Sequence, residues 1–482
     1  IMLKRKRNKT KIVATLGPAS CEEEIIEQLM LSGVTMFRLN TSHNTAEEHA
    51  KTIEKIRTIE KKLKVFIPIL VDLQGPKIRV GNLIKPIQLE VGMELVLEYG
   101  LEQTNPDIVP VDYKGIADDV HEGECILLDD GKIKIQVTKK EGTKVYVKVL
   151  HGELLKPRKG INVPGGTGSV SAITERDVEF IKFAVAHEAD YIALSFVRDK
   201  DDVLLAKKYI SHFGADIPVI SKIEKPEAVD NIEEILDVTD AVMVARGDLG
   251  IELSPEKVPM VQKKIIESSF KHRKTCIVAT QMLESMIEEP IPTRAEASDV
   301  ANAILDGADA VMLSGETAMG KYPVEAVKMM AKIARNVEDS SFCNYNLNLD
   351  MNEDYEPTPQ AIADAAVKMA DFLGAKAILA FTHTGYTTRL LSKLRPKVPV
   401  IAVSDMEKTC RKLNLYWDIH PYLKNWDVDL TDNLLKKIDK LLHEKTDFQT
   451  DDRVIIIGSI PKLITGRTNF VRVHRIDALI NK

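Results

Sequence analysis

Eight short apolar segments, separated by helix-length amphipathic stretches, constrain the fold of this chain more than any other feature. Each combines β-branched and small apolar residues between turn formers, the pattern of a buried strand. They occupy residues 11–17, 36–42, 65–73, 191–196, 218–224, 241–249, 275–281 and 310–316. Eight strands alternating with helices is the count of a closed (β/α)8 TIM barrel. An open doubly wound sheet is the alternative, but no G-x-G-x-x-G follows the first segment. We therefore predict an α/β protein built on such a barrel.

The alternation is interrupted between residues 74 and 168. Short β-rich pieces with glycine turns occur there, including an alternation of lysine and isoleucine just after Asp130-Gly131. This pattern predicts a small antiparallel β-barrel domain, inserted after the third strand and flanked by hinges that let it act as a lid. After Asn336 a polar, turn-rich stretch predicts a linker to a C-terminal α/β domain. The expected domains are the barrel at 1–75 and 169–345, the insertion at 76–168 and the C-terminal domain at 346–482.

Charge and composition restrict the partners and the cellular compartment expected for this chain. A net charge of −6 over 482 residues disfavours nucleic acid as a partner. No apolar run approaches the roughly 18 residues of a membrane span, and no apolar segment accompanies the basic stretch at residues 4–7. The five cysteines are isolated and form neither a disulfide framework nor a zinc pattern. We therefore expect a cytoplasmic protein that binds neither membranes nor nucleic acid.

Charged residues end two consecutive predicted strands. Lys222 and Glu224 are two residues apart, so on an extended strand they point to the same face, and Asp248 closes the next predicted strand. An ammonium and two carboxylates at neighbouring strand ends can form a site for a divalent metal with an anionic substrate. Each residue alone would be interpreted as a solvated strand end or a loop cap. In parallel α/β barrels the active site lies at this end of the strands, which favours a catalytic site over solvated strand ends.

Two earlier strands end in polar residues as well. Arg38, Asn40 and Ser42 alternate along the second strand, so they share one face, and Asp72 ends the third. Arg38 and Lys222 offer positive charge suited to a phosphoryl group, the first as a planar fork and the second as a point charge.

The later strand ends supply oxygen ligands and hydroxyl groups. Glu224 and Asp248 are hard ligands suited to Mg²⁺, which takes few carboxylates and completes its shell with substrate oxygens and water. Gly247 lets backbone N–H groups approach a small carboxylate closely. Thr280 and Ser314 could position or relay a proton, although such residues at strand ends more often act as caps.

Many long segments of this chain resemble those of the pyruvate kinase family, in the family's order and nearly throughout residues 10–330. They are KIVATLGPAS, FRLNTSH, LVDLQGPKIRVG, KGINVPG, SKIE, MVARGDLG, ATQMLESMI, PTRAEASDVANAILDGADAVMLSGETA and KYPVEAV. The resemblance implies transfer of phosphate from phosphoenolpyruvate to ADP, giving ATP and pyruvate in the last step of glycolysis. It also implies a mobile lid, a regulatory C-terminal domain and a homotetramer.

The resemblance assigns roles to the strand-end residues. Lys222 is expected to neutralise the phosphoryl group during its transfer, and Arg38 to bind it. Glu224 and Asp248 are expected to hold Mg²⁺, for which Mn²⁺ is expected to substitute. The backbone of Gly247 and Asp248 is expected to bind the substrate carboxylate.

Further roles concern the proton and the nucleotide. Thr280 is expected to help bind the carboxylate and to relay a proton to the enolate, with Ser314 ordering water. Asn40, Arg79 and Lys159 match nucleotide contacts of the family, so closure of the lid would assemble the ADP site. A second Mg²⁺ is expected to arrive with the nucleotide.

One departure from the family pattern bears on potassium. The family's potassium site is matched by four residues: Asn40, Ser42, Asp72 and, through its carbonyl, Leu73. Lys77, however, stands where potassium-activated members have glutamate, and the Leu-Gln…Lys…Val set around it is that of the potassium-independent branch. We hypothesise that the Lys77 ammonium replaces K⁺, so that K⁺ is not required. The alternative is that Lys77 is a surface charge and K⁺ still binds.

A threonine-rich loop at 381–388 lies where the family binds phosphorylated effectors. It follows a predicted strand and opens a predicted helix, so its hydroxyls and N–H groups could cradle a phosphate. The residues concerned are Thr382, His383, Thr384, Gly385 and Thr387, with Arg467 as a cation from a second loop. His383 stands where bisphosphate-activated members have lysine, which favours a monophosphate such as a sugar monophosphate or AMP. A plain threonine-rich helix start is the alternative.

Two other functions are compatible with parts of this pattern. A Mg²⁺-dependent lyase or aldolase acting on 2-oxo acids would use a similar pair of carboxylates, but it would need neither a lid with Arg79 and Lys159 nor ADP. A catalytically silent metabolite sensor would bind phosphoenolpyruvate without turnover. The sensor is disfavoured because no expected catalytic position is replaced.

Overall fold

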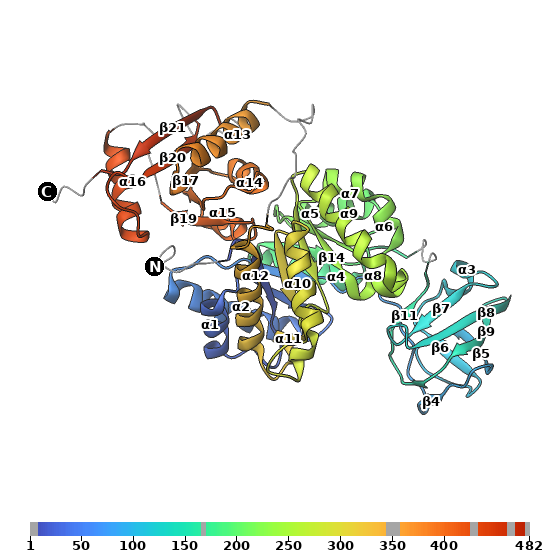
Figure 1. Cartoon of the computed structure of the whole chain (residues 1–482). Helices are drawn as coiled ribbons and strands as arrows, with labels where there is room; N and C mark the ends of the chain where they lie inside the picture. The colour runs from blue at the N-terminus through green and yellow to red at the C-terminus, as the bar shows by residue number, and fades with distance from the viewer. Residues whose placement is uncertain (1–7, 165–169, 344–356, 425–431, 460–467, 478–482) are drawn as a thin grey trace.

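The computed structural model describes residues 8–164, 170–343, 357–424, 432–459 and 468–477 (Figure 1). In these ranges the strands form a central barrel, an inserted β domain and a C-terminal sheet. Figure 1 shows the insertion and the C-terminal region on different sides of the barrel. No helix in the described ranges combines the length and the hydropathy needed to cross a membrane.

Among the described residues, eight strands close into a barrel in which every neighbouring pair is parallel. They are β1 (Lys11–Thr15), β2 (Met36–Asn40), β3 (Ile69–Asp72), β12 (Tyr191–Leu194), β13 (Val219–Ile223), β14 (Ala241–Ala245), β15 (Thr275–Ala279) and β16 (Ala310–Leu313). Each lies within one of the eight predicted segments, so the predicted barrel is confirmed. The pairing of β1 with β16 closes the ring.

Continuous apolar runs form these strands because both of their faces are buried. Residues such as Ile12 pack outward under the helices, whereas Val13 and Met36 belong to a separate core inside the barrel. The main surrounding helices are α1 (Glu23–Ser32), α2 (Ala46–Leu63), α4 (Glu175–Ala186), α5 (Lys200–His212), α6 (Pro226–Asp230), α7 (Ile232–Val238), α9 (Val258–Lys271), α10 (Arg294–Leu305) and α12 (Pro323–Glu338). Capping boxes start α2, α4 and α10. Two short helices, α8 (Arg246–Glu252) and α11 (Gly315–Ala318), directly follow strands.

The insertion is a β domain with its own apolar core. Its elements are β4 (Ile87–Gln88), β5 (Glu94–Tyr99), β6 (Ile108–Val111), α3 (Ile116–Asp119), β7 (Cys125–Leu128), β8 (Ile133–Glu141), β9 (Lys144–His151), β10 (Leu154–Leu155) and β11 (Ile161–Asn162). In its described part, six strands pair in the order β11-β7-β8-β9-β5-β6, and β10 pairs with β4. The expected antiparallel pairing holds except between β5 and β6, which are parallel. The predicted Asp130-Gly131 turn joins β7 to β8 with φ values of 55° and 84°.

The C-terminal region is an α/β unit, as predicted. Its described strands pair in the order β19-β18-β17-β20-β21, with β21 antiparallel. The strands are β17 (Ala377–Phe381), β18 (Val400–Ser404), β19 (Ile419–Leu423), β20 (Arg453–Gly458) and β21 (Phe470–Arg475), and the helices are α13 (Pro357–Phe372), α14 (Tyr386–Lys393), α15 (Glu407–Leu413) and α16 (Asp432–Lys445). Helix α13 begins inside the predicted linker, and β19 was not predicted.

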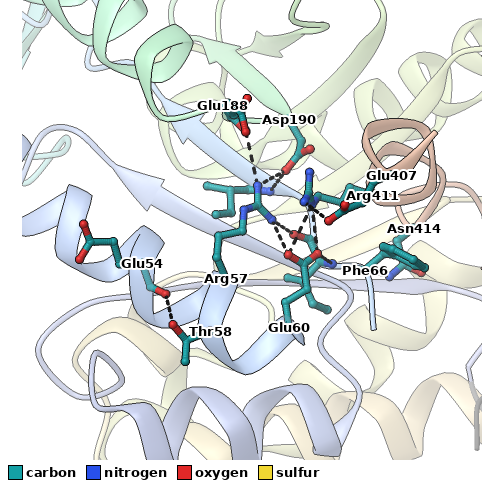
Figure 2. Close-up of polar contacts among 12 residues, drawn as sticks. Glu54, Arg57, Thr58, Glu60, Phe66, Glu188, Asp190, Glu407, Arg411 and Asn414 are labelled. Atoms are coloured by element: carbon teal, nitrogen blue, oxygen red, sulfur yellow. Dashed lines mark hydrogen bonds and ion pairs between the residues drawn. The ribbon is translucent and has the colours of Figure 1, made fainter. Parts of the chain in front are cut away.

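The C-terminal region is anchored to the underside of the barrel. Leu415, just after α15, is fully buried in the core inside the barrel. Figure 2 shows an ion-pair network that joins the two regions, in which Arg411 of α15 contacts Glu60 of α2 at 3.1 Å. In the same network Arg57 contacts Asp190 at 2.8 Å. This junction lies at the end of the barrel opposite to the carboxyl ends of the strands.

Candidate active site

The polar residues predicted at strand ends meet at the carboxyl end of the barrel. Arg38 lies on β2, Asp72 ends β3, Lys222 lies on β13 and Glu224 follows it directly. The four are almost fully buried, with exposed fractions of 9%, 1%, 9% and 0% in that order. Burial of so many charges requires pairing, because an unpaired ion in the interior is strongly unfavourable.

The pairing is a continuous chain of opposite charges. Arg38 Nε contacts Asp72 Oδ2 at 2.6 Å, and Lys222 Nζ lies 3.4 Å from Asp72 Oδ1 and 2.9 Å from Glu224 Oε1. Arg38 also donates to Thr15 Oγ1. Two cations and two carboxylates therefore alternate across strands β2, β3 and β13, and the set is neutral overall.

The pairing also shifts the ionisation of the cluster. Burial would raise the pKa of Asp72, but Lys222 and Arg38 outweigh it and lower that pKa. Burial would lower the pKa of Lys222, but Asp72 and Glu224 raise it above its usual value. Burial raises the pKa of Glu224, with Lys222 opposing and Asp248 adding to the rise. Lys222 is therefore an ammonium throughout the physiological range.

The prediction that Asp248 ends a strand is wrong. Strand β14 stops at Ala245, and Asp248 lies in the first turn of α8. The chain turns into this helix at once, and the Gly247 N–H donates to Thr280 Oγ1 at 2.7 Å, across to the loop after β15. The nearby cation is Lys77, whose Nζ lies 3.6 Å from Asp248 Oδ1 and 3.9 Å from Asp130 Oδ1.

Thr280 occupies a strained turn after β15. Its φ of 67° is unfavourable for a β-branched residue, and such outliers persist where the surroundings enforce them. Its hydroxyl accepts from Gly247 and donates to Ala279 O at 2.6 Å. Arg246, to which the sequence analysis assigned no role, donates to Thr280 O at 2.7 Å and pairs with Asp299. The signal that could have identified Arg246 was its place between a strand and Gly247.

The other hydroxyl and amide groups of the predicted site are partly engaged. The Ser314 N–H donates to Glu316, while Ser314 Oγ is buried without a hydrogen-bond partner. Asn40 Oδ1 accepts from Ser42 N at 3.1 Å. The Leu73 carbonyl accepts from Ser195 Oγ at 2.7 Å.

Two of the three predicted nucleotide contacts, Arg79 and Lys159, lie near the two ends of the insertion, whereas Asn40 ends β2 of the barrel. Arg79 forms a bridge with Gly160, and its side chain donates to Arg158 O at 3.2 Å. Lys159 pairs with Asp129 at 2.7 Å, in the turn that also carries Asp130. The Lys77 and Lys159 cations therefore both face acidic residues of the β7–β8 turn.

The threonine-rich loop and the second predicted loop meet in the C-terminal region. Thr387 Oγ1 and Thr468 Oγ1 are 2.6 Å apart. Thr382 Oγ1 accepts from Gly385 N, and His383 Nδ1 lies 2.8 Å from Asp405 Oδ1. Thr384 is exposed. Arg467 lies outside the described residues.

Comparisons with known proteins agree with this architecture. The family model described as pyruvate kinase, barrel domain, matches residues 7–327, and the model of the pyruvate kinase alpha/beta domain matches residues 360–474. Pyruvate kinases from Staphylococcus aureus strains MRSA252 and USA300 are each 44% identical over 479 residues. The matched region covers 98% of this chain and 81% of each relative. The chain therefore belongs to the pyruvate kinase family, whose enzymes use phosphoenolpyruvate and ADP with a divalent cation, and pyruvate kinase is its activity.

Proposed function

We propose that the buried charge cluster is where this enzyme carries out phosphoryl transfer. The observation that carries the proposal is Lys222, an ammonium held at a strand end between Asp72 and Glu224. In the reaction the bond between phosphorus and the enolate oxygen breaks, and a bond to an oxygen of the ADP β-phosphate forms. Lys222 and Arg38 stabilise the charge on the phosphoryl oxygens, which is the main demand of this chemistry. In the described part of the chain Arg38 contacts Asp72 through Nε and Thr15 through Nη1, which leaves Nη2 for a phosphoryl oxygen.

The chemistry of the donor set fits a divalent cation held by Glu224 and Asp248. Glu224 is fully buried, and its Oε1 lies 2.9 Å from Lys222 Nζ. Within the described residues no three His, Cys, Asp or Glu side chains gather as a ready cage. A site with two carboxylates completed by substrate oxygens is the mode that Mg²⁺ prefers, and we propose Mg²⁺ with Mn²⁺ as a substitute. The bound cation would supply Lewis-acid stabilisation of substrate oxygens.

The Gly247–Thr280 pair is proposed to receive the substrate carboxylate. The Gly247 N–H now donates to Thr280 Oγ1, and both groups become available to the carboxylate once they separate. Thr280 is then the proposed proton relay to the enolate carbon. Ser314 Oγ, buried without a partner, is suited to order a water beside it.

We further propose that Asn40, Arg79 and Lys159 contact the nucleotide and that the insertion, residues 76–168, closes over it as a lid. The bound nucleotide would carry a second Mg²⁺ on its phosphate oxygens. The polyphosphate would replace Asp129 as the partner of Lys159, because both present anionic oxygens to the same ammonium.

We propose that K⁺ is not required. Lys77 is 26% exposed and faces Asp248, a proposed metal ligand, which argues against a freely solvated surface charge. Among the described residues Lys77 forms ion pairs with Asp248 and Asp130, and neither residue belongs to the set that matches the family's potassium site. The proposed role of Lys77 is to supply the charge that K⁺ otherwise supplies, so Lys77→Glu should create K⁺ dependence, and a variant still fully active without K⁺ would refute this role.

The threonine-rich loop at 381–388 is proposed to bind a phosphate monoester such as a sugar monophosphate or AMP. The enzyme is also proposed to be a cytoplasmic homotetramer. The contact between Thr387 and Thr468 supports a shared pocket. Calorimetry with sugar monophosphates, AMP and a bisphosphate tests the ligand class, and no heat from any of them would refute it. Light scattering should give four times the chain mass of 53.8 kDa.

The test of the whole proposal is pyruvate formation from phosphoenolpyruvate with Mg²⁺ and ADP, first without potassium or ammonium and then with potassium. A full rate without potassium supports the kinase chemistry and the role of Lys77. Activity only after potassium is added refutes the role of Lys77. Loss of activity in Lys222→Met is expected, and a Lys222→Met enzyme of normal rate would refute the proposed centre.

A further inference from the structure

Ser195 links two strands of the active site and is none of the residues proposed to bind substrate, metal or nucleotide. It directly follows β12, which lies between β3 and β13 in the barrel. Its side chain is buried, with the residue 1% exposed. Ser195 Oγ donates to Leu73 O at 2.7 Å and accepts from Lys222 Nζ at 2.7 Å. The hydroxyl therefore bridges β3 and β13.

The two hydrogen bonds fix the orientation of the Ser195 hydroxyl group. A hydroxyl has one proton, and here the Leu73 carbonyl takes it, so Ser195 Oγ presents only lone pairs to the ammonium. Lys222 Nζ also contacts two carboxylates, Glu224 Oε1 at 2.9 Å and Asp72 Oδ1 at 3.4 Å. An ion pair attracts without strong orientation, whereas a hydrogen bond weakens steeply when it bends. Of these three contacts of Lys222, the one to Ser195 Oγ is the shortest, at 2.7 Å, and the only one made to a neutral group.

The residue after Ser195 shows that this turn is held in place by its surroundings. Phe196 has a φ of 56°, which is unfavourable for a bulky residue, and its N–H donates to Glu224 Oε2 at 2.8 Å. A Cβ added at Gly75 would come within 2.9 Å of Ser195 Cβ, so the β3 loop packs tightly against it. One turn therefore orients Lys222 through a hydroxyl and Glu224 through a backbone amide.

We propose that Ser195 is a positioning residue that keeps the Lys222 ammonium aimed at the phosphoryl group during transfer. This inference rests on the proposed role of Lys222. A divalent cation on Glu224 would compete with Lys222 for that carboxylate and repel the ammonium, and Asp72 is shared with Arg38. Ser195, which is uncharged and tied to Leu73, keeps its hold on Lys222 when Glu224 changes partner.

Ser195→Ala tests the proposal, with Ser221→Ala as the matched control. Ser221 precedes Lys222 on β13 and is fully buried, but its hydroxyl contacts Thr239 at 2.8 Å. Loss of a hydrogen bond to a charged group predicts that Ser195→Ala lowers kcat by about 10- to 100-fold. KM for phosphoenolpyruvate should change much less, and Ser221→Ala should keep kcat within about twofold.

Two readouts separate positioning from a structural defect. Mn²⁺ binding measured by electron paramagnetic resonance should be the same in Ser195→Ala and wild type, because the Phe196 N–H still holds Glu224. Ser195→Thr, which restores a hydroxyl, should recover at least part of kcat. A parallel loss of kcat and Mn²⁺ binding, or a Ser195→Ala enzyme equal to Ser221→Ala, would overturn the proposal. If Ser195→Ala equals Ser221→Ala while Lys222→Met is inactive, only the role of Ser195 is refuted and the proposed catalytic centre is not. An active Lys222→Met enzyme would refute the centre itself.

Discussion

Replacing Asp72 with asparagine removes one of the two carboxylates in the buried cluster. Asp72 is 1% exposed and contacts Arg38 at 2.6 Å and Lys222 at 3.4 Å. Asparagine keeps the size but not the charge, so two cations remain with Glu224 alone and the set changes from neutral to +1. Removing one partner of a buried ion pair costs about 3–5 kcal/mol, because the remaining charge stays buried. We expect Asp72→Asn to lower the free energy of unfolding by this amount.

The control is Asp371→Asn, which breaks an ion pair of similar length at the surface. Asp371 lies 2.8 Å from Lys397, with side chains 56% and 77% exposed. Exposed pairs contribute about 0–1 kcal/mol, so the control should change little. Urea denaturation followed by circular dichroism compares the two variants with wild type. Equal midpoints for Asp72→Asn and Asp371→Asn would refute the argument from burial.

The effect of Asp72→Asn should also depend on pH. Lys222 and Arg38 outweigh burial and lower the pKa of Asp72 in the fold. A carboxyl whose pKa is lowered by folding contributes stability above its unfolded pKa of about 4, and that contribution is lost as pH falls through the folded pKa. The difference between wild type and Asp72→Asn should therefore shrink at acid pH, and a constant difference down to acid unfolding would contradict this reading.

Two further predictions concern packing and charge away from the site. Leu415→Ala should lower the free energy of unfolding by about 2–5 kcal/mol, because Leu415 is fully buried inside the barrel. The control Leu423→Ala removes a side chain that is 40% exposed and should lower it much less. Equal urea midpoints for the two variants would refute the role of Leu415 in anchoring the C-terminal region. Burial lowers the pKa of Lys274 to about 8, so above that pH the unfolded chain binds more protons than the folded one. The stability of wild type relative to Lys274→Gln should therefore rise between about pH 7.5 and about pH 9.5. Thermal unfolding of both proteins at the two pH values measures this difference, and a fall would contradict the direction of the pKa shift.

The barrel was predictable because its strands are buried on both faces. Apolar runs of this kind are visible in the sequence whatever the strands pair with, and all eight predicted segments contain a barrel strand. Strand β19 escaped prediction because it includes His420 and Pro421. It lies at the edge of its sheet, where proline is tolerated because one side of the strand needs no ladder hydrogen bonds. The parallel pairing of β5 with β6 was likewise invisible, because a strand pattern does not specify its neighbour.

The candidate site was predictable only as far as strand ends are concerned. In a parallel barrel all carboxyl ends of the strands meet, so Arg38, Asp72, Lys222 and Glu224 were expected together, and the structure pairs them. Asp248 was placed on a strand because the apolar run before it continues into Arg246-Gly247. A local pattern cannot tell where the strand turns into a short helix when the decisive contact, from Gly247 to Thr280, comes from another strand.

The sequence by itself therefore determined the barrel, the position of the insertion and the polar residues that face its open end, because these depend on local burial patterns along the chain. Only the tertiary structure decided the partners. Lys77 contacts Asp248, Ser195 lies between Leu73 and Lys222, and Leu415 fills the base of the barrel. Each partnership joins segments distant in sequence, and strand register and packing geometry, which no local pattern encodes, bring their atoms within contact distance.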